Sequence, residues 1–121
     1  MRLAELDPEW VRWEDRVDND GDVLPPGKVR TFVPTVATLA EAQGIEFDCP
    51  KCGPRAHRIQ VAFHDRGVLD HQGSRNKEGK PTRWHVASGS TFDDLSLTPS
   101  IDCTPSDPNC WHGFITNGEA T

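Results

Sequence analysis

Two short cysteine-containing segments constrain the fold of this chain more than any other feature of its sequence. The first is C-P-K-C-G at residues 49–53, a tight loop whose two sulfurs can be directed at one point. The second is C-W-H at residues 110–112, which adds a third sulfur and an imidazole. Three thiolates and an imidazole are the ligands that Zn²⁺ favours at closed structural sites. The sequence therefore predicts a structural zinc ion held by Cys49, Cys52, Cys110 and His112.

The fourth cysteine leaves the ligand set open. Cys103 could replace His112 and give four sulfur ligands, or it could be a buried thiol. We favour His112 together with Cys110, because residues two apart in a strand lie on the same side. A redox role for Cys49 and Cys52 would need a helix beginning at the second cysteine, and the G-P that follows prevents one.

The composition indicates one small domain that needs a cross-link, either disulfides or a metal ion, to be stable. The chain has 121 residues, only 35% of them hydrophobic, with ten glycines and ten prolines. So thin a core is usually reinforced by disulfides or a metal. The N-terminus has no apolar stretch typical of a signal peptide, and no run is long enough to cross a membrane. We therefore expect a reducing cytoplasm, where structural disulfides are rare and a zinc ion is the better cross-link.

Charge is distributed unevenly along the chain. The net charge of −6 argues against general nucleic-acid binding. Residues 51–85 nevertheless carry eight basic and three acidic side chains, between two acidic flanks. This segment either pairs with those flanks or contacts an anionic partner.

The first 44 residues are expected to form an N-terminal arm with short helices and one strand. Apolar residues at three- and four-residue steps, including Trp10 and Trp13, predict a short helix from about residue 8 to residue 16. The acidic segment 18–22 resembles the start of an EF-hand loop, but it lacks the glutamate required at the twelfth position and is interpreted as a turn. Alternation over residues 28–34 predicts a strand, and a capping-box pattern predicts a short helix at residues 38–44.

Residues 45–121 are expected to form a zinc-stabilised β domain, continuous with the arm as one structural unit. Residues 45–63 predict a hairpin with the metal near its tip, and residues 65–81 predict a long exposed loop. Further strands are expected near residues 84–89, 95–101 and 111–116, with a turn at Asn117-Gly118. The fold class is a small antiparallel, β-rich (α+β) domain with a zinc knuckle and one or two short helices.

Several of these segments together resemble a known family. C-P-K-C-G, the L-S-L-T-P-S-I segment at residues 95–101 and C-W-H-G-F-I-T-N-G-E at residues 110–119 are similar to small uncharacterised phage and prophage proteins, some of which carry the label ammonia monooxygenase. The resemblance covers about residues 45–120. It implies a metal-binding β domain of unknown activity, with Cys49, Cys52, Cys110 and His112 at the family's Cys/His positions and Cys103 outside them.

These observations favour a non-enzymatic phage accessory protein that binds another macromolecule. The expected partner is a protein, either a virion component or a host factor, because we find no catalytic motif and expect no catalytic residue. One alternative is a small metal-dependent hydrolase using His57, His64, Asp65 or His85 around an open metal. Another is a zinc ribbon that binds nucleic acid through its basic segment, with the following residues: Arg55, Arg58, Arg66, Arg75, Lys77, Lys80 and Arg83.

Overall fold

The computed structural model describes residues 1–18, 28–104 and 108–121. Its main element is a four-stranded antiparallel sheet with strand order β4-β1-β5-β6. The bounds of these strands are β1 Glu9–Val11, β4 Thr35–Val36, β5 Gly44–Asp48 and β6 Arg58–Ala62. The predicted class, a small antiparallel β-rich domain, is confirmed.

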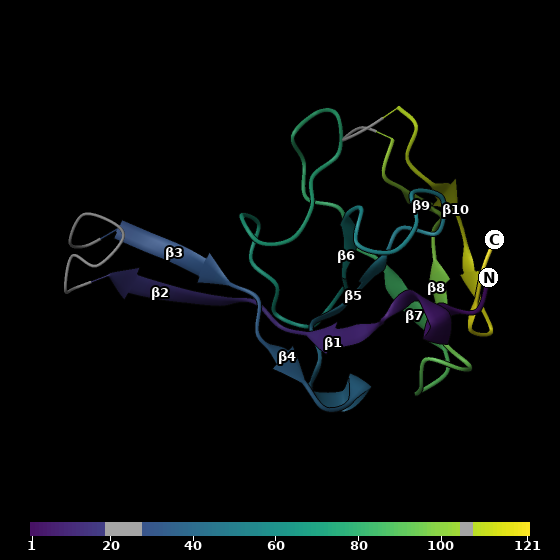
Figure 1. Cartoon of the computed structure of the whole chain (residues 1–121). Coiled ribbons are helices and arrows are strands. Elements are labelled where there is room, and N and C mark those ends of the chain that lie inside the picture. The colour runs from purple at the N-terminus through teal and green to yellow at the C-terminus, as the bar shows by residue number, and fades with distance from the viewer. Residues whose placement is uncertain (19–27, 105–107) are drawn as a thin grey trace.

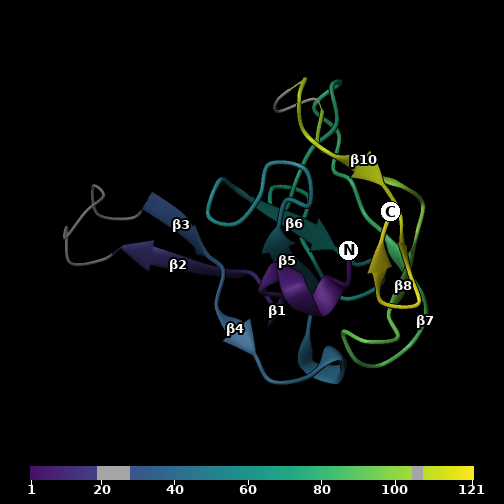
Figure 2. The same cartoon turned by 45° about the vertical axis from the view of Figure 1, so that its right-hand side comes forward.

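The remaining strands form four two-stranded pairs around this sheet: β2-β3, β7-β8, β9-β10 and β11-β12. Their bounds are β2 Glu14–Asp18, β3 Lys28–Phe32, β7 His85–Ser88, β8 Ser96–Thr98, β9 Ile101–Asp102, β10 His112–Gly113, β11 Ile115–Thr116 and β12 Glu119–Ala120. The β2-β3 hairpin extends away from the body, whereas the two chain termini lie beside each other (Figures 1 and 2). Arg2 and Glu119 form a β-bridge that joins those termini.

The predicted helix over residues 8–16 is wrong, because this segment supplies β1 and the start of β2. Trp10 lies opposite Ile45 on one side and Val36 on the other, so the β1 backbone bonds to two neighbouring strands. Only two 3₁₀ turns, η1 (Leu3–Leu6) and η2 (Leu39–Glu41), are helical among the described residues. Sheet pairing has overridden a weak helical pattern here.

Several predicted elements are confirmed. Residues 45–63 form the β5-β6 hairpin, residues 28–32 form β3, and η2 lies within the short helix expected at residues 38–44. The long loop between β6 and β7 is also present, as Figure 1 shows. The EF-hand-like turn lies largely outside the described residues.

The core lies between the four-stranded sheet and the C-terminal pairs. Phe47 and Ile45 of β5 are fully buried, together with Leu95, Ile101 and Ile115 from the second half of the chain. Leu3 and Trp10 belong to the same cluster, so residues on both sides of the expected 44/45 boundary build one core. In the described part of the chain, no helix has the length and apolar character needed to cross a membrane.

Candidate metal centre

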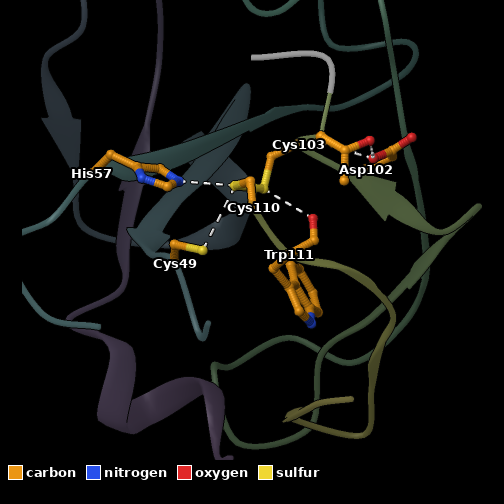
Figure 3. Close-up of a disulfide and its surroundings, with 7 residues drawn as sticks. Cys49, His57, Asp102, Cys103, Cys110 and Trp111 are labelled. Atoms are coloured by element: carbon orange, nitrogen blue, oxygen red, sulfur yellow. Dashed lines mark hydrogen bonds between the residues drawn. A yellow bond between two sulfur atoms is a disulfide. The ribbon is translucent and has the colours of Figure 1, made fainter. Parts of the chain in front are cut away.

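Two hairpins bring the sulfur ligands together. The β5-β6 hairpin presents Cys49, directly after β5, and His57, directly before β6. Cys103 follows β9 and Cys110 precedes β10 in the second hairpin. The side-chain ligand atoms of these four residues all lie within 4.8 Å of one another, so they could bind a metal ion (Figure 3).

The hairpin register explains why His57 belongs to this group. Asp48 pairs with Arg58, and the Cys49 amide donates to the His57 carbonyl at 3.2 Å. Cys49 and His57 are therefore cross-strand neighbours at the end of the ladder. On the second hairpin, the Cys103 amide donates to the Trp111 carbonyl at 3.0 Å, which fixes the loop that carries Cys110.

Distances at the centre partly match a tetrahedral ion. Two thiolates bound at about 2.3 Å to one tetrahedral zinc lie about 3.8 Å apart. Cys49 Sγ and Cys110 Sγ are 3.7 Å apart, and His57 Nε2 is 3.0 Å from Cys110 Sγ. Cys103 and Cys110, however, form a disulfide in this structure. The same sulfurs could bind a metal as thiolates only after reduction and separation.

The environment of Cys49 favours a thiolate. Burial by itself raises the pKa of this thiol, but backbone hydrogen bonds from Cys52, Lys51 and Trp111 and a side-chain hydrogen bond from Cys52 outweigh it. The pKa of Cys49 is therefore lower than usual. Because metals bind the thiolate rather than the thiol, this loop prepares Cys49 as a ligand.

The backbone at the end of this loop favours glycine. Gly53 has φ of +88°, a left-handed conformation that residues with a Cβ rarely adopt. Its amide donates to the Cys49 carbonyl at 3.1 Å and closes the turn. The C-P-K-C-G sequence thus forms the tight loop that its spacing indicates.

Two of the sequence-predicted ligands differ in position from the four-residue group. His112 is exposed on β10, and its Nε2 lies 3.2 Å from Ser100 Oγ. Cys52 is partly buried and contacts Cys49 through its side chain, although the group within 4.8 Å does not include it. Cys49 and Cys110 are brought together as expected, and His57 and Cys103 join them within 4.8 Å. Cys52 contacts Cys49 from outside this group, and His112 is directed to Ser100.

Apolar groups cover the inner side of the centre. Cys49 and Cys110 are buried, and Trp111 packs edge-on against Phe47 with ring centroids 6.2 Å apart. Such a shell excludes water and strengthens bonds between thiolates and a metal ion.

Of the histidines in the hydrolase hypothesis, His57 lies at the centre and His64 does not. His57 and His64 flank β6 and are seven residues apart, and residues in a strand advance about 3.3 Å each, so about 23 Å separates them. His64 instead stacks on His85, with ring centroids 4.1 Å apart.

Several arginines of the basic segment serve the fold rather than a surface. Arg58 bonds or pairs with four carboxylates, those of Asp7, Glu9, Glu46 and Asp48. Arg66 donates to two backbone carbonyls near η2, at 2.8 Å each. These contacts leave fewer basic groups for a nucleic acid than the sequence suggests.

Comparisons of the chain with protein-family models, with curated proteins and with solved structures found no match.

Proposed function

We propose that this chain is a zinc-stabilised β domain that acts by binding another protein, in the manner of a phage accessory protein. The metal-binding part of this proposal rests on one group of residues, whose ligand atoms lie within 4.8 Å of one another: Cys49, His57, Cys103 and Cys110. The accessory role, in a virion or against a host factor, rests on the family resemblance of the C-terminal half. The role is non-enzymatic in this proposal, because four protein ligands fill a tetrahedral ion.

Zinc is the metal that this ligand chemistry favours. Three thiolates and an imidazole suit a borderline-soft ion without geometric preference, and oxygen-preferring ions such as Mg²⁺ and Ca²⁺ gain little from sulfur. In the proposed state, the ion joins the β5-β6 hairpin to the β9-β10 hairpin. Structural zinc contributes apparent binding energies of about 10–16 kcal/mol in small domains, enough to decide whether a thin core folds.

The disulfide and the metal are alternative states of one centre. A disulfide between Cys103 and Cys110 leaves Cys49 and Cys52 as thiols. Zinc binding therefore belongs to the reduced protein, in which all four cysteines can be thiolates. An oxidised sample should have two titratable thiols and little zinc.

Elemental analysis of the reduced protein tests the proposal. We expect one zinc per chain in the wild type, lost in Cys110→Ser and Cys103→Ser and retained in Cys52→Ser. Loss of zinc in Cys52→Ser with retention of zinc in Cys103→Ser would instead favour Cys52 as the partner of Cys49, as predicted from the sequence. A wild-type protein that takes up no zinc when reduced would refute the metal site.

A further inference from the structure

A cleft of about 1110 Å³ adjoins the metal centre. One wall is formed by the loop between β6 and β7, including Lys77 and Pro81, and the other by residues 99–103. Figures 1 and 2 show the β6-β7 loop and the segment that leads to β10 rising at the same end of the molecule. His57 and Cys103 line the cleft, so its end meets the proposed zinc ligands.

The free edge of the main sheet lies inside this cleft. β6 is the last strand in the order β4-β1-β5-β6, and its residues Arg58, Ile59 and Gln60 line the cleft. Odd-numbered residues along this strand bond to β5: the His57 carbonyl accepts from Cys49, and the Phe63 amide donates to Gln43. Because the pattern alternates, the N–H and C=O groups of Arg58 and Gln60 point to the opposite edge.

One residue of the chain, Trp84, pairs with this edge beside Ala62, and the described residues before it do not. The Trp84 amide donates to the Ala62 carbonyl at 2.9 Å, and the His64 amide donates to the Trp84 carbonyl at 2.8 Å. Upstream, Thr82 bonds to Ser74 instead. Within the described residues, the backbone groups of Arg58 and Gln60 on this edge have no hydrogen-bond partner. Unpaired groups of this kind are a template for an added strand.

The cleft that contains this edge also carries positive charge. Arg75, Lys77 and Arg83 line it, and none of them has a carboxylate within 4.0 Å among the described residues. Arg75 and Arg83 are held by backbone carbonyls, which position the guanidinium groups without neutralising them. Two carboxylates, Glu78 and Asp102, also line the cleft, so cations are in excess there although the chain as a whole is acidic.

We propose that an extended, acidic peptide segment of a partner protein binds in this cleft as an added strand on β6. Main-chain hydrogen bonds to Arg58 and Gln60 supply affinity, and the cationic side chains that line the cleft select acidic side chains. Because Trp84 already bonds to Ala62, the free part of the edge runs from Arg58 to Gln60 and spans about 10 Å, so the bound segment pairs with it over about three residues. The inference deepens the proposed function, because it rests on a protein partner and names where that partner binds.

A single substitution removes one of the required backbone groups. Gln60→Pro eliminates the outward N–H and breaks no bond to β5, because proline is tolerated on an edge strand where the N–H faces away from the sheet. Gln60→Ala changes the same side chain but keeps that N–H, and it is the matched control. A zinc content and a Tm equal to those of the wild type show that both variants are folded.

The probe is a random library of linear peptides twice as long as the free edge, selected against immobilised wild-type protein. We expect enriched sequences with excess Asp and Glu that bind Gln60→Ala as they bind wild type and bind Gln60→Pro at least tenfold more weakly. The same peptides, N-methylated at the alternate amides that face β6, should not bind the wild-type protein. This comparison provides a readout that is independent of any protein variant.

Other outcomes would overturn the inference. One is a selection that enriches no acidic peptides. Another is peptide binding that neither Gln60→Pro nor N-methylation weakens. A third is a cleft that binds a thymidine oligonucleotide or a second copy of this chain instead of a peptide. Zinc content of the same samples separates the two proposals. Peptide binding without zinc refutes only the metal site, whereas a zinc-loaded protein without peptide binding refutes only the added strand.

Discussion

His57 Nε2 lies 3.0 Å from Cys110 Sγ, a contact that joins the return strand of one hairpin to the entry of another. His112, two residues beyond Cys110, is directed instead to Ser100. The two histidines therefore offer a direct comparison between the ligand that the geometry favours and the ligand that the sequence predicts.

Removal of the His57 side chain should destabilise the reduced, zinc-loaded protein. Loss of one ligand from a structural site removes part of the zinc binding energy, and a loss of about 3 kcal/mol lowers Tm by about 10 °C in a domain of this size. We expect such a decrease for His57→Ala and almost none for His112→Ala. Thermal unfolding followed by circular dichroism measures both, and the opposite order would assign the fourth ligand to His112.

Arg58 should be the ionic group on which the fold depends most. Its side chain is 25% exposed and shared among four carboxylates, which would repel one another without it. Because the site is partly screened, we expect Arg58→Met to lower the free energy of unfolding by about 2 kcal/mol. Arg12→Met removes an exposed pair with Glu14 and should cost less than about 0.5 kcal/mol. Equal urea midpoints for the two variants would contradict this.

Gly118 should tolerate a methyl group less well than Gly79. Both have a left-handed φ, +76° and +78°, which costs about 1–2 kcal/mol for a residue with a Cβ. A Cβ at Gly118 would lie 2.3 Å from the Asp93 carbonyl oxygen, whereas nothing lies within 4 Å at Gly79. Overpacking adds on the order of 1–3 kcal/mol, so Gly118→Ala should unfold at a clearly lower urea concentration than Gly79→Ala.

Asp94 should contribute to the loss of stability in acid. Hydrogen bonds from the Thr91 amide, then the Ser90 amide and the Thr91 hydroxyl, hold the pKa of this carboxyl below its ordinary value of 3.8. A lowered folded-state pKa means that the contribution is present above pH 3.8 and is lost as the pH falls through the folded value.

Substitution of Asp94 should therefore matter more at neutral pH than in acid. We expect Asp94→Asn to lower the urea midpoint at neutral pH, and we expect its difference from wild type to shrink as the pH falls below 3.8. Glu5→Gln, on the exposed side of η1, serves as the control for the loss of a carboxylate. A difference between Asp94→Asn and wild type that is constant with pH would show that the charge has no role.

The hairpin and the β-rich class were predictable because their signals are local. Residues 45–63 combine alternation with a turn fixed by Gly53, and both features remain in the folded chain. The assignment of β1 was not predictable, because Trp10 and Trp13 suit a helical face equally well. The pairing of Trp10 with Ile45 and Val36 determines that this segment is a strand.

The candidate metal centre was predictable in part. Cys49 and Cys110 were identified from ligand spacing, but His57 was considered only as a ligand of an open metal in the hydrolase alternative. Its signal was the hairpin register: counting back from the tip pairs His57 with Cys49. The position of Cys103 beside Cys110 depends on the β9-β10 pairing. Strands of two residues leave no recognisable pattern in the sequence, so this pairing could not be predicted.

The zinc-edge X-ray absorption spectrum of the reduced wild-type protein, recorded beside that of His57→Ala, tests the proposed ligand set most directly. We expect one zinc bound to three sulfurs and one nitrogen in the wild type, with the nitrogen contribution lost or replaced by oxygen in the variant. A spectrum of four sulfurs, an unchanged nitrogen signal in His57→Ala, or a protein without zinc would contradict it.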